Sequence, residues 1–115
     1  MKPKNLVFLM TDQQRFDTLG MTACGREVTP NLNALAREGV SFQRAYDACP
    51  LCVPARTALA TGRSPLANGM LLNDLPGRYA RENPTLHGLL AENGWEVAHI
   101  GVAHISVKPP LRQAV

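Results

Sequence analysis

The residues best suited to chemistry lie in one short segment, where Cys52, Pro54 and Arg56 are spaced two residues apart. Proline is favoured in the first turn of a helix, so a helix is expected to begin beside the cysteine. The first N–H groups of a helix lack partners within it and carry partial positive charge, which stabilises an anion such as sulfate or phosphate. Arg56 follows Cys52 by about one helical turn, so its guanidinium can bind the same anion. The spacing therefore favours oxyanion chemistry at Cys52.

A second group of polar residues follows a short apolar run near the start of the chain. Residues 5–10 are mainly apolar, and Asp12, Gln13 and Gln14 come directly after them. Such a run predicts a strand buried on both faces of a parallel sheet. In open α/β sheets, ligands bind beyond the carboxyl ends of the strands. We therefore expect these polar side chains to face a ligand site.

Local signals predict the elements that would position these two groups. Thr29 is a candidate N-cap, Pro30 suits the first helical position and Gly39 suits the helix end, which predicts a helix between them. Two further helices are predicted, one over residues 54–61 that ends at Gly62 and one over residues 84–94. Strands are predicted over residues 40–46 and 95–100. Loops are expected at residues 20–27, 47–54 and 63–83. This order of elements indicates an α/β fold, a sheet with helices packed on it.

Size and composition exclude several classes of protein. A chain of 115 residues suits one small domain, and a net charge of +3 with scattered basic residues and 5% aromatics does not favour a nucleic-acid partner. No apolar run approaches the roughly 20 residues that span a membrane. No secretory leader is recognisable, which favours a cytoplasmic location. Three cysteines are an odd number and argue against a disulfide framework.

The segment from Cys52 to Arg56, followed by Thr61-Gly62-Arg63, resembles the signature of the sulfatase family within the alkaline-phosphatase-like superfamily. The resemblance implies that a separate formylglycine-generating enzyme oxidises Cys52 to formylglycine (3-oxoalanine). In the family, the hydrated aldehyde attacks the sulfur of a small-molecule sulfate ester, and its second hydroxyl later expels sulfate. Arg56 is then implied to orient this group and to stabilise its charge. Ala55 stands where serine is commoner.

Three further blocks occur in family order. Residues 9–20 resemble the first metal-binding turn, which implies that Asp12, Gln13 and residue 52 ligate one divalent cation, Ca²⁺, Mn²⁺ or Mg²⁺. Residues 29–42 resemble the helix and strand before the nucleophile, and residues 84–95 resemble the helix before the third strand. The form of residues 12–15 resembles the subgroup of choline sulfatases and phosphonate monoester hydrolases.

The resemblance implies a fold as well as a site. Residues 1–106 would be the N-terminal part of a sulfatase catalytic domain, with a mixed, mostly parallel sheet of the alkaline-phosphatase type and helices packed on it. Residues 107–115 show no periodic pattern and are expected to be an irregular tail at a truncation point. A sheet that ends on an unpaired strand would also expose an edge through which another chain could associate.

The chain departs from the family pattern after the third predicted strand. The family has Gly-Lys-x-His there, with both the lysine and the histidine on the ester; this chain keeps His104 but has Val102 in place of the lysine. Loss of such a cationic contact costs on the order of 10² to 10³ in rate. The remaining metal ligands of the family would lie beyond Val115. We therefore expect family membership without activity of these 115 residues alone.

Three functions stay open on this basis: a sulfuric ester hydrolase, a phosphate or phosphonate monoester hydrolase of the same superfamily, and a catalytically incomplete fragment or pseudoenzyme. Other interpretations of single residues are weaker. Cys49 and Cys52 form a Cys-x-x-Cys pair, but a zinc or redox site would need a second pair or a suitable strand–turn–helix. Cys24 is expected to be structural, and His87 and His99 have no assigned role.

Overall fold

The computed structural model describes residues 5–73 and 84–106 of the chain. The chain divides into two compact units, residues 1–44 and residues 45–115, and each unit is described by itself. The predicted tail at 107–115 lies outside the described residues, as does the part of the predicted loop from residue 74 to residue 83.

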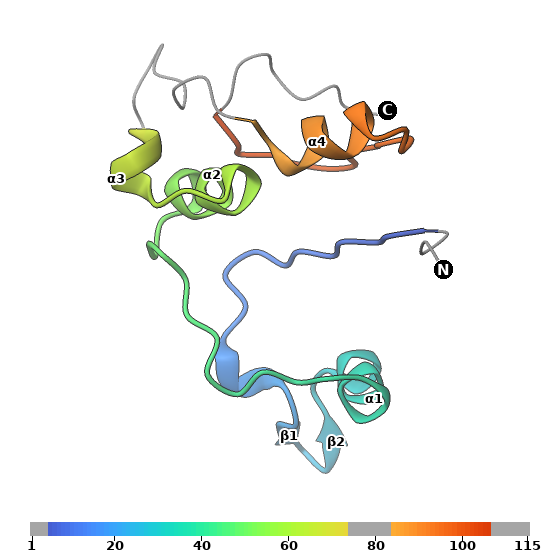
Figure 1. Cartoon of the computed structure of the whole chain (residues 1–115). Helices are drawn as coiled ribbons and strands as arrows, with labels where there is room; N and C mark the ends of the chain where they lie inside the picture. The colour runs from blue at the N-terminus through green and yellow to red at the C-terminus, as the bar shows by residue number, and fades with distance from the viewer. Residues whose placement is uncertain (1–4, 74–83, 107–115) are drawn as a thin grey trace. The chain divides into compact units, whose positions relative to one another are not determined.

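Unit 1 contains a short hairpin followed by a helix (Figure 1). After the 3₁₀ helix η1, Phe16–Thr18, strands β1, Thr22–Ala23, and β2, Arg26–Glu27, pair antiparallel, and helix α1 follows at Pro30–Glu38. The turn residues Cys24 and Gly25 have φ angles of 51° and 73°. A two-residue hairpin turn of type I′ needs a positive φ at both positions, so the sequence forms a turn that the strands can close.

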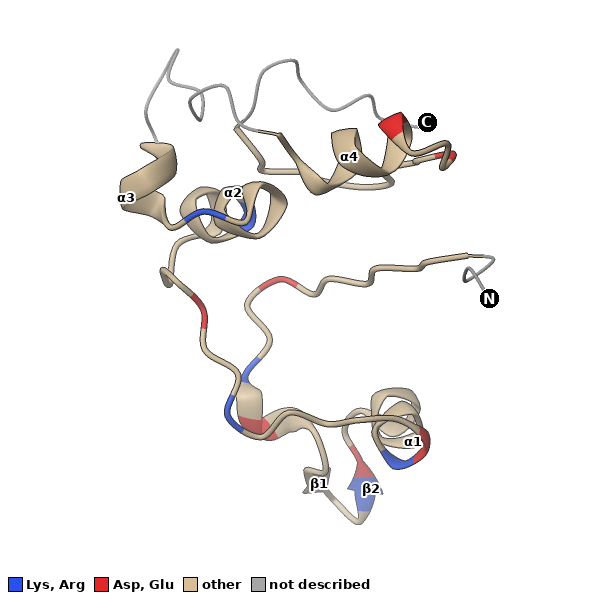
Figure 2. Cartoon of the chain, viewed as in Figure 1, with Lys and Arg blue, Asp and Glu red and all other residues tan. Residues whose placement is uncertain are grey.

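Helix α1 is joined to the preceding loop by polar contacts. The side chain of Asn33 is buried, and its Oδ1 accepts the N–H of Gly20 at 2.7 Å. The hydroxyl of Thr29 donates to the carbonyl of Thr18 at 3.0 Å. On the exposed side, basic and acidic residues are interspersed (Figure 2), and Arg37 lies 3.3 Å from the Glu27 carboxylate.

Unit 2 is helical in its described part. Helix α2, Cys52–Thr61, contacts both α3, Pro65–Asn68, and α4, Leu86–Glu92. Gly62 ends α2 with a left-handed φ of 65°. The core is small: Met70 is 1% exposed and packs against Val53 and Ile105. Among the residues of this unit that the structure describes, the other buried ones are Pro54, Thr57, Ala60, Pro65 and Asn68.

The three predicted helices are confirmed, and each of their ends lies within two residues of the predicted position. The structure has them at Pro30–Glu38, Cys52–Thr61 and Leu86–Glu92. Thr85 caps α4 by accepting the N–H of Gly88 at 3.0 Å. These elements could be predicted because their start and stop signals lie within the helix or next to it.

The three predicted strands are not formed among the described residues. Residues 5–10 and 40–46 form no strand, and residues 95–100 contain only an isolated bridge at His99. The strands present, β1 and β2, lie in a predicted loop and are antiparallel, and α3 also lies in a predicted loop. Residues 5–10 were expected to be buried on both faces, yet Leu9 is 79% exposed. A strand of that kind needs paired neighbours and covering helices, which the described residues do not provide.

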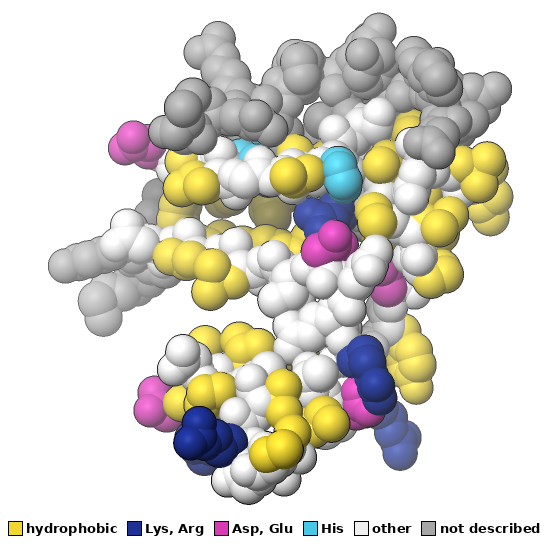
Figure 3. Space-filling view, turned by 180° about the vertical axis from the view of Figure 1, so that it is seen from behind, with side chains coloured by type: hydrophobic (Ala, Val, Ile, Leu, Met, Phe, Trp, Pro, Cys, Tyr) yellow, Lys and Arg dark blue, Asp and Glu magenta, His cyan; other side chains and the backbone are white. Residues whose placement is uncertain are grey.

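Large apolar side chains remain on the surface of both units (Figure 3). Val7 is 77% exposed, Val40 79% and Ile100 85%. Exposed apolar side chains in such number are typical of places where further protein packs. The longest helix in the described part of the chain, α2, has 10 residues, too few to span a bilayer.

We predict that the isolated 115-residue chain associates in solution and binds a hydrophobic dye such as ANS, because its apolar residues are not covered. Size-exclusion chromatography at increasing protein concentration and dye fluorescence measure this. Replacing Val7 and Leu9 by serine should lower both signals, whereas the exposed polar change Gln43→Ser should not. A monomer at all concentrations without dye binding would contradict the prediction.

Candidate functional site

Cys52 is the first residue of α2 and is half-buried, whereas the sequence predicted a helix that begins two residues later, at Pro54. The preceding Leu51 is extended and provides no side-chain cap, and Pro54 has no N–H. The N–H of Val53 donates to Oδ1 of Asn73 at 3.0 Å. Because Asn73 occupies this donor, the helix start offers an anion fewer N–H groups than the sequence suggested.

Asn73 is a site residue that the sequence analysis missed. It lies 20 residues after Val53, in a segment that was expected to be irregular, and no local motif marks it. Its side-chain oxygen acts as a cap for α2 from a distance in sequence. Only the tertiary structure shows the contact, because capping signals are sought within a few residues of the helix start.

Asn73→Ala should therefore destabilise α2 by about 1 kcal/mol, the usual cost of a lost N-terminal cap. Urea unfolding of the chain followed by circular dichroism measures the change in free energy of unfolding. Asn73→Asp is the matched control, since a carboxylate keeps the acceptor and favours a helix N-terminus. If the alanine and aspartate variants lose the same free energy of unfolding, the side-chain oxygen at position 73 does not stabilise α2.

Arg56 is half-buried and one turn along α2 from Cys52. Its Nη1 donates to the carbonyl oxygen of Val102 at 3.3 Å. This contact connects α2 with residues 101–104, the segment that carries His104. His104 is exposed and has a φ of 45°, in the left-handed region that few residues other than glycine adopt. Within unit 2, the structure thus brings Arg56 to the His104 segment.

Asp12 and Gln13 belong to unit 1, at the end of the extended run. Gln13 has a left-handed φ of 51°, so the chain turns sharply directly after Asp12. The following Arg15 is paired with Asp17, and the hydrogen bond from this guanidinium lowers the pKa of the Asp17 carboxyl. Asp17 is thus part of an exposed ion pair. Its charge is compensated locally, so it is not a candidate ligand.

The predicted metal site combines residues of both units, and it stays a prediction. Asp12 and Gln13 provide oxygen donors, the type that Ca²⁺, Mn²⁺ and Mg²⁺ prefer. In the described ranges 5–73 and 84–106, no three His, Cys, Asp or Glu side chains gather closely enough to hold a metal ion. The donor chemistry fits a hard cation, but two side chains are fewer than the six or more oxygens such an ion takes.

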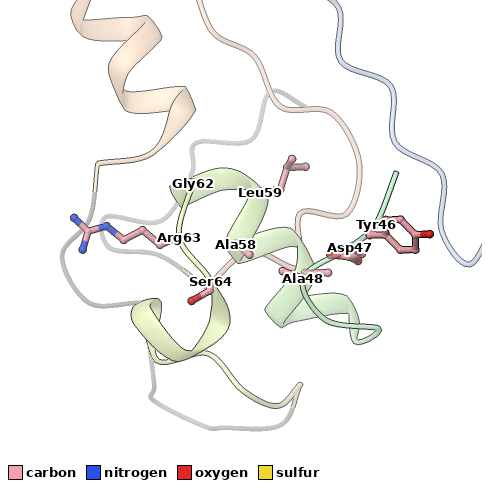
Figure 4. A pocket seen from close by; sticks show the side chains of 9 residues that line it. Tyr46, Asp47, Ala48, Ala58, Leu59, Gly62, Arg63 and Ser64 are labelled. Carbon is pink, nitrogen blue, oxygen red and sulfur yellow. The ribbon is translucent and has the colours of Figure 1, made fainter. Parts of the chain in front are cut away.

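A pocket of about 420 Å³ lies along one face of α2 (Figure 4). Ala55, Ala58 and Leu59 form one wall, and residues 46–48 form another. Arg63 extends from one end of the helix and Tyr46 lies at the opposite end in this view. Neither Cys52 nor Arg56 lines the pocket. It is mainly apolar and therefore does not correspond to the predicted oxyanion site.

Comparison with known proteins gives consistent matches. The sulfatase family model matches residues 4–110. An ulvan-active sulfatase of Formosa agariphila is 37% identical over 88% of this chain and 19% of its own length. The mouse N-acetylgalactosamine-6-sulfatase is 33% identical over 94% of this chain and 23% of its own length. An arylsulfatase of Clostridium perfringens is 35% identical over 91% of this chain and 21% of its own length. The chain spans about a fifth of the length of these relatives. No solved structure matches the chain.

Proposed function

This chain belongs to the sulfatase family, and we therefore propose that it carries the nucleophile segment of a sulfuric ester hydrolase. The supporting observation is the position of Cys52 as the first residue of α2, with Arg56 one turn further on. In this proposal, Cys52 is the precursor of formylglycine, and a formylglycine-generating enzyme is the partner that modifies it. Once formed, the group would supply a hydrated aldehyde as the nucleophile toward the sulfur of a sulfate ester.

Arg56 is proposed to bind the charged group of the ester. Its guanidinium is planar and has five N–H donors, a geometry that suits an oxyanion, and its Nη1 contacts the Val102 carbonyl. Because Arg56 is half-buried, its charge is less screened than on an open surface, which strengthens binding of sulfate. Its role is then to hold the ester in line with residue 52.

His104 is proposed to contact the ester or its leaving group, where an imidazole can donate a proton. Val102, which replaces the lysine of the family pattern, provides only its backbone carbonyl, and this oxygen accepts from Arg56. A cation is thus missing at that position of the segment. This observation favours a second candidate, a catalytically incomplete pseudoenzyme with a sulfatase fold.

Asp12 and Gln13 are proposed as ligands of one divalent cation, Ca²⁺, Mn²⁺ or Mg²⁺, together with residue 52. The ion would offset the negative charge of the ester. Apart from residue 52, this site has only two ligand side chains, whereas such an ion takes six or more oxygen ligands. The proposal therefore requires further oxygen ligands. In the same proposal, the extended run before Asp12 becomes a strand of a mostly parallel sheet once its exposed apolar side chains are covered.

The substrate class in this proposal is a small-molecule sulfate ester, and a phosphate or phosphonate ester is the alternative. Two of the relatives are named for ulvan and N-acetylgalactosamine, and one for aryl sulfates. The subgroup of choline sulfatases and phosphonate monoester hydrolases stays a prediction, as does the cytoplasmic location.

Mass spectrometry of the peptide that contains Cys52 tests the proposal directly. After co-expression with a formylglycine-generating enzyme, the peptide should be lighter than its thiol form by about 18 Da, since SH₂ is replaced by O. Detection of the thiol alone would overturn the assignment of Cys52. Hydrolysis of an aryl sulfate compared with an aryl phosphate, with Mn²⁺ or Ca²⁺ added, then separates the two ester classes; activity on neither favours the pseudoenzyme.

A further inference from the structure

Two histidines outside the proposed site lie close together in unit 2. His87 is in the first turn of α4, and His99 lies in the segment that returns after this helix. Their ring centroids are 6.1 Å apart, with the ring planes tilted by 56°. Both residues are half-buried, although they are separated by a helix and a turn in the sequence. The fold therefore holds two imidazoles against each other.

Each ring has a buried nitrogen that the structure leaves without a partner. Nδ1 of His87 and Nε2 of His99 have no hydrogen-bond partner among the described residues. Buried polar atoms in proteins are almost always paired, so these two nitrogens on neighbouring rings are candidates for binding a ligand. Burial lowers the pKa of His87, and the nearby His99 lowers it further.

The spacing suits a shared metal ion. A Zn²⁺–nitrogen bond is about 2.0–2.1 Å long, and the nitrogen lies about 1.2 Å from the ring centre, so each ring centre lies about 3.2 Å from a bound ion. Two rings on one ion then have centres about 5.2 Å apart at a tetrahedral angle and about 6.4 Å apart when opposed. The observed 6.1 Å is about 0.9 Å longer than the tetrahedral separation, so the two rings would move together by this distance on binding a tetrahedral ion.

We propose that His87 and His99 together bind one borderline divalent transition-metal ion, with Zn²⁺ as the type case and water in the remaining positions. Imidazole nitrogens prefer such ions, whereas the oxygen donors of Asp12 and Gln13 suit harder ones, so the two sites select different metals. A bound ion links α4 to the segment around His99, five residues before His104. The inference does not depend on sulfatase activity.

Zinc titration of the full chain tests the site. The thiols must first be capped with iodoacetamide, because cysteine thiolates also bind zinc. The chain has only three histidines, so each ring can be followed by NMR. Adding ZnCl₂ should shift the ring signals of His87 and His99 together and saturate at one ion per chain, while His104 stays unchanged. Equal shifts of all three rings, or none at millimolar zinc, would overturn the proposal.

His87→Gln and His99→Gln should each weaken zinc binding about tenfold or more, as expected when one of two protein ligands is removed. His104→Gln is the matched control and should bind zinc like the unchanged chain. Affinity should also fall on acidification, since protons compete for the same nitrogens. If all three variants bind zinc equally, the ion binds elsewhere and the proposal fails. The NMR titration uses the unchanged sequence, so it tests the proposal even if a variant does not fold.

Discussion

Replacing Cys52 by serine should abolish formylglycine formation and lower sulfate ester hydrolysis by a factor on the order of 10⁴ or more, the scale seen when a nucleophile is removed. The reason is chemical. A serine that attacked the sulfur would form a sulfate ester but would lack the second hydroxyl that expels sulfate by restoring the aldehyde. The peptide mass and the rate of aryl sulfate hydrolysis, in a preparation that shows this activity, measure the two effects.

Cys49→Ser is the matched control for this variant. Cys49 is half-buried like Cys52 and lies three residues before it, but it is outside α2 and the motif. Its replacement should leave both the mass shift and the hydrolysis rate within about twofold of the starting protein, as is usual for changes outside the reacting groups. Retained activity in Cys52→Ser, or its loss in Cys49→Ser alone, would contradict the assignment of the nucleophile.

Arg56→Ala should lower kcat/KM for an aryl sulfate by a factor on the order of 10² to 10³, because a positioned cation that stabilises developing charge is lost. Arg56→Lys should recover only part of this rate. Lysine keeps the charge but cannot donate two parallel hydrogen bonds, nor easily hold the Val102 carbonyl and the ester together. Steady-state kinetics with an aryl sulfate provide the measurement.

Arg37→Ala is the control for Arg56→Ala, since Arg37 forms an exposed ion pair with Glu27 in unit 1. Such pairs contribute little, so both activity and stability should hardly change. Urea unfolding separates the roles of Arg56. If Arg56→Ala loses activity only in proportion to the fraction unfolded, the residue supports the fold through Val102 and does not act on the ester.

The helices of this protein could be predicted because their signals are local. The predicted N-cap Thr29 precedes α1 but provides no side-chain cap, since its hydroxyl donates to the carbonyl of Thr18. Pro30 is the first residue of α1, Gly62 ends α2 in a left-handed conformation, and Thr85 caps α4 through its own side chain. Each signal acts within about one turn of the helix end, so no knowledge of distant residues is needed. The position of Cys52 near the start of α2 followed from the same reasoning.

The strands could not be predicted in the same way. An apolar run such as residues 5–10 is typical of a buried strand, but a strand forms only when distant residues supply hydrogen-bond partners. In the described residues, that run is extended and exposed, whereas the short hairpin at Cys24 and Gly25 forms because its turn and its two strands are adjacent in sequence. Local pairing needs no distant partner.

The family of this protein, the Cys-x-Pro-x-Arg motif from Cys52 to Arg56 and the helix that contains it all follow from the amino-acid order, since each depends on residues within a few positions of one another. Three other contacts became visible only in the folded chain: Asn73 binds the N–H beside Cys52, Arg56 reaches the backbone of Val102, and His87 lies against His99. These contacts join residues that are 12 or more positions apart. Packing of the whole unit sets such distances, and no local spacing encodes them.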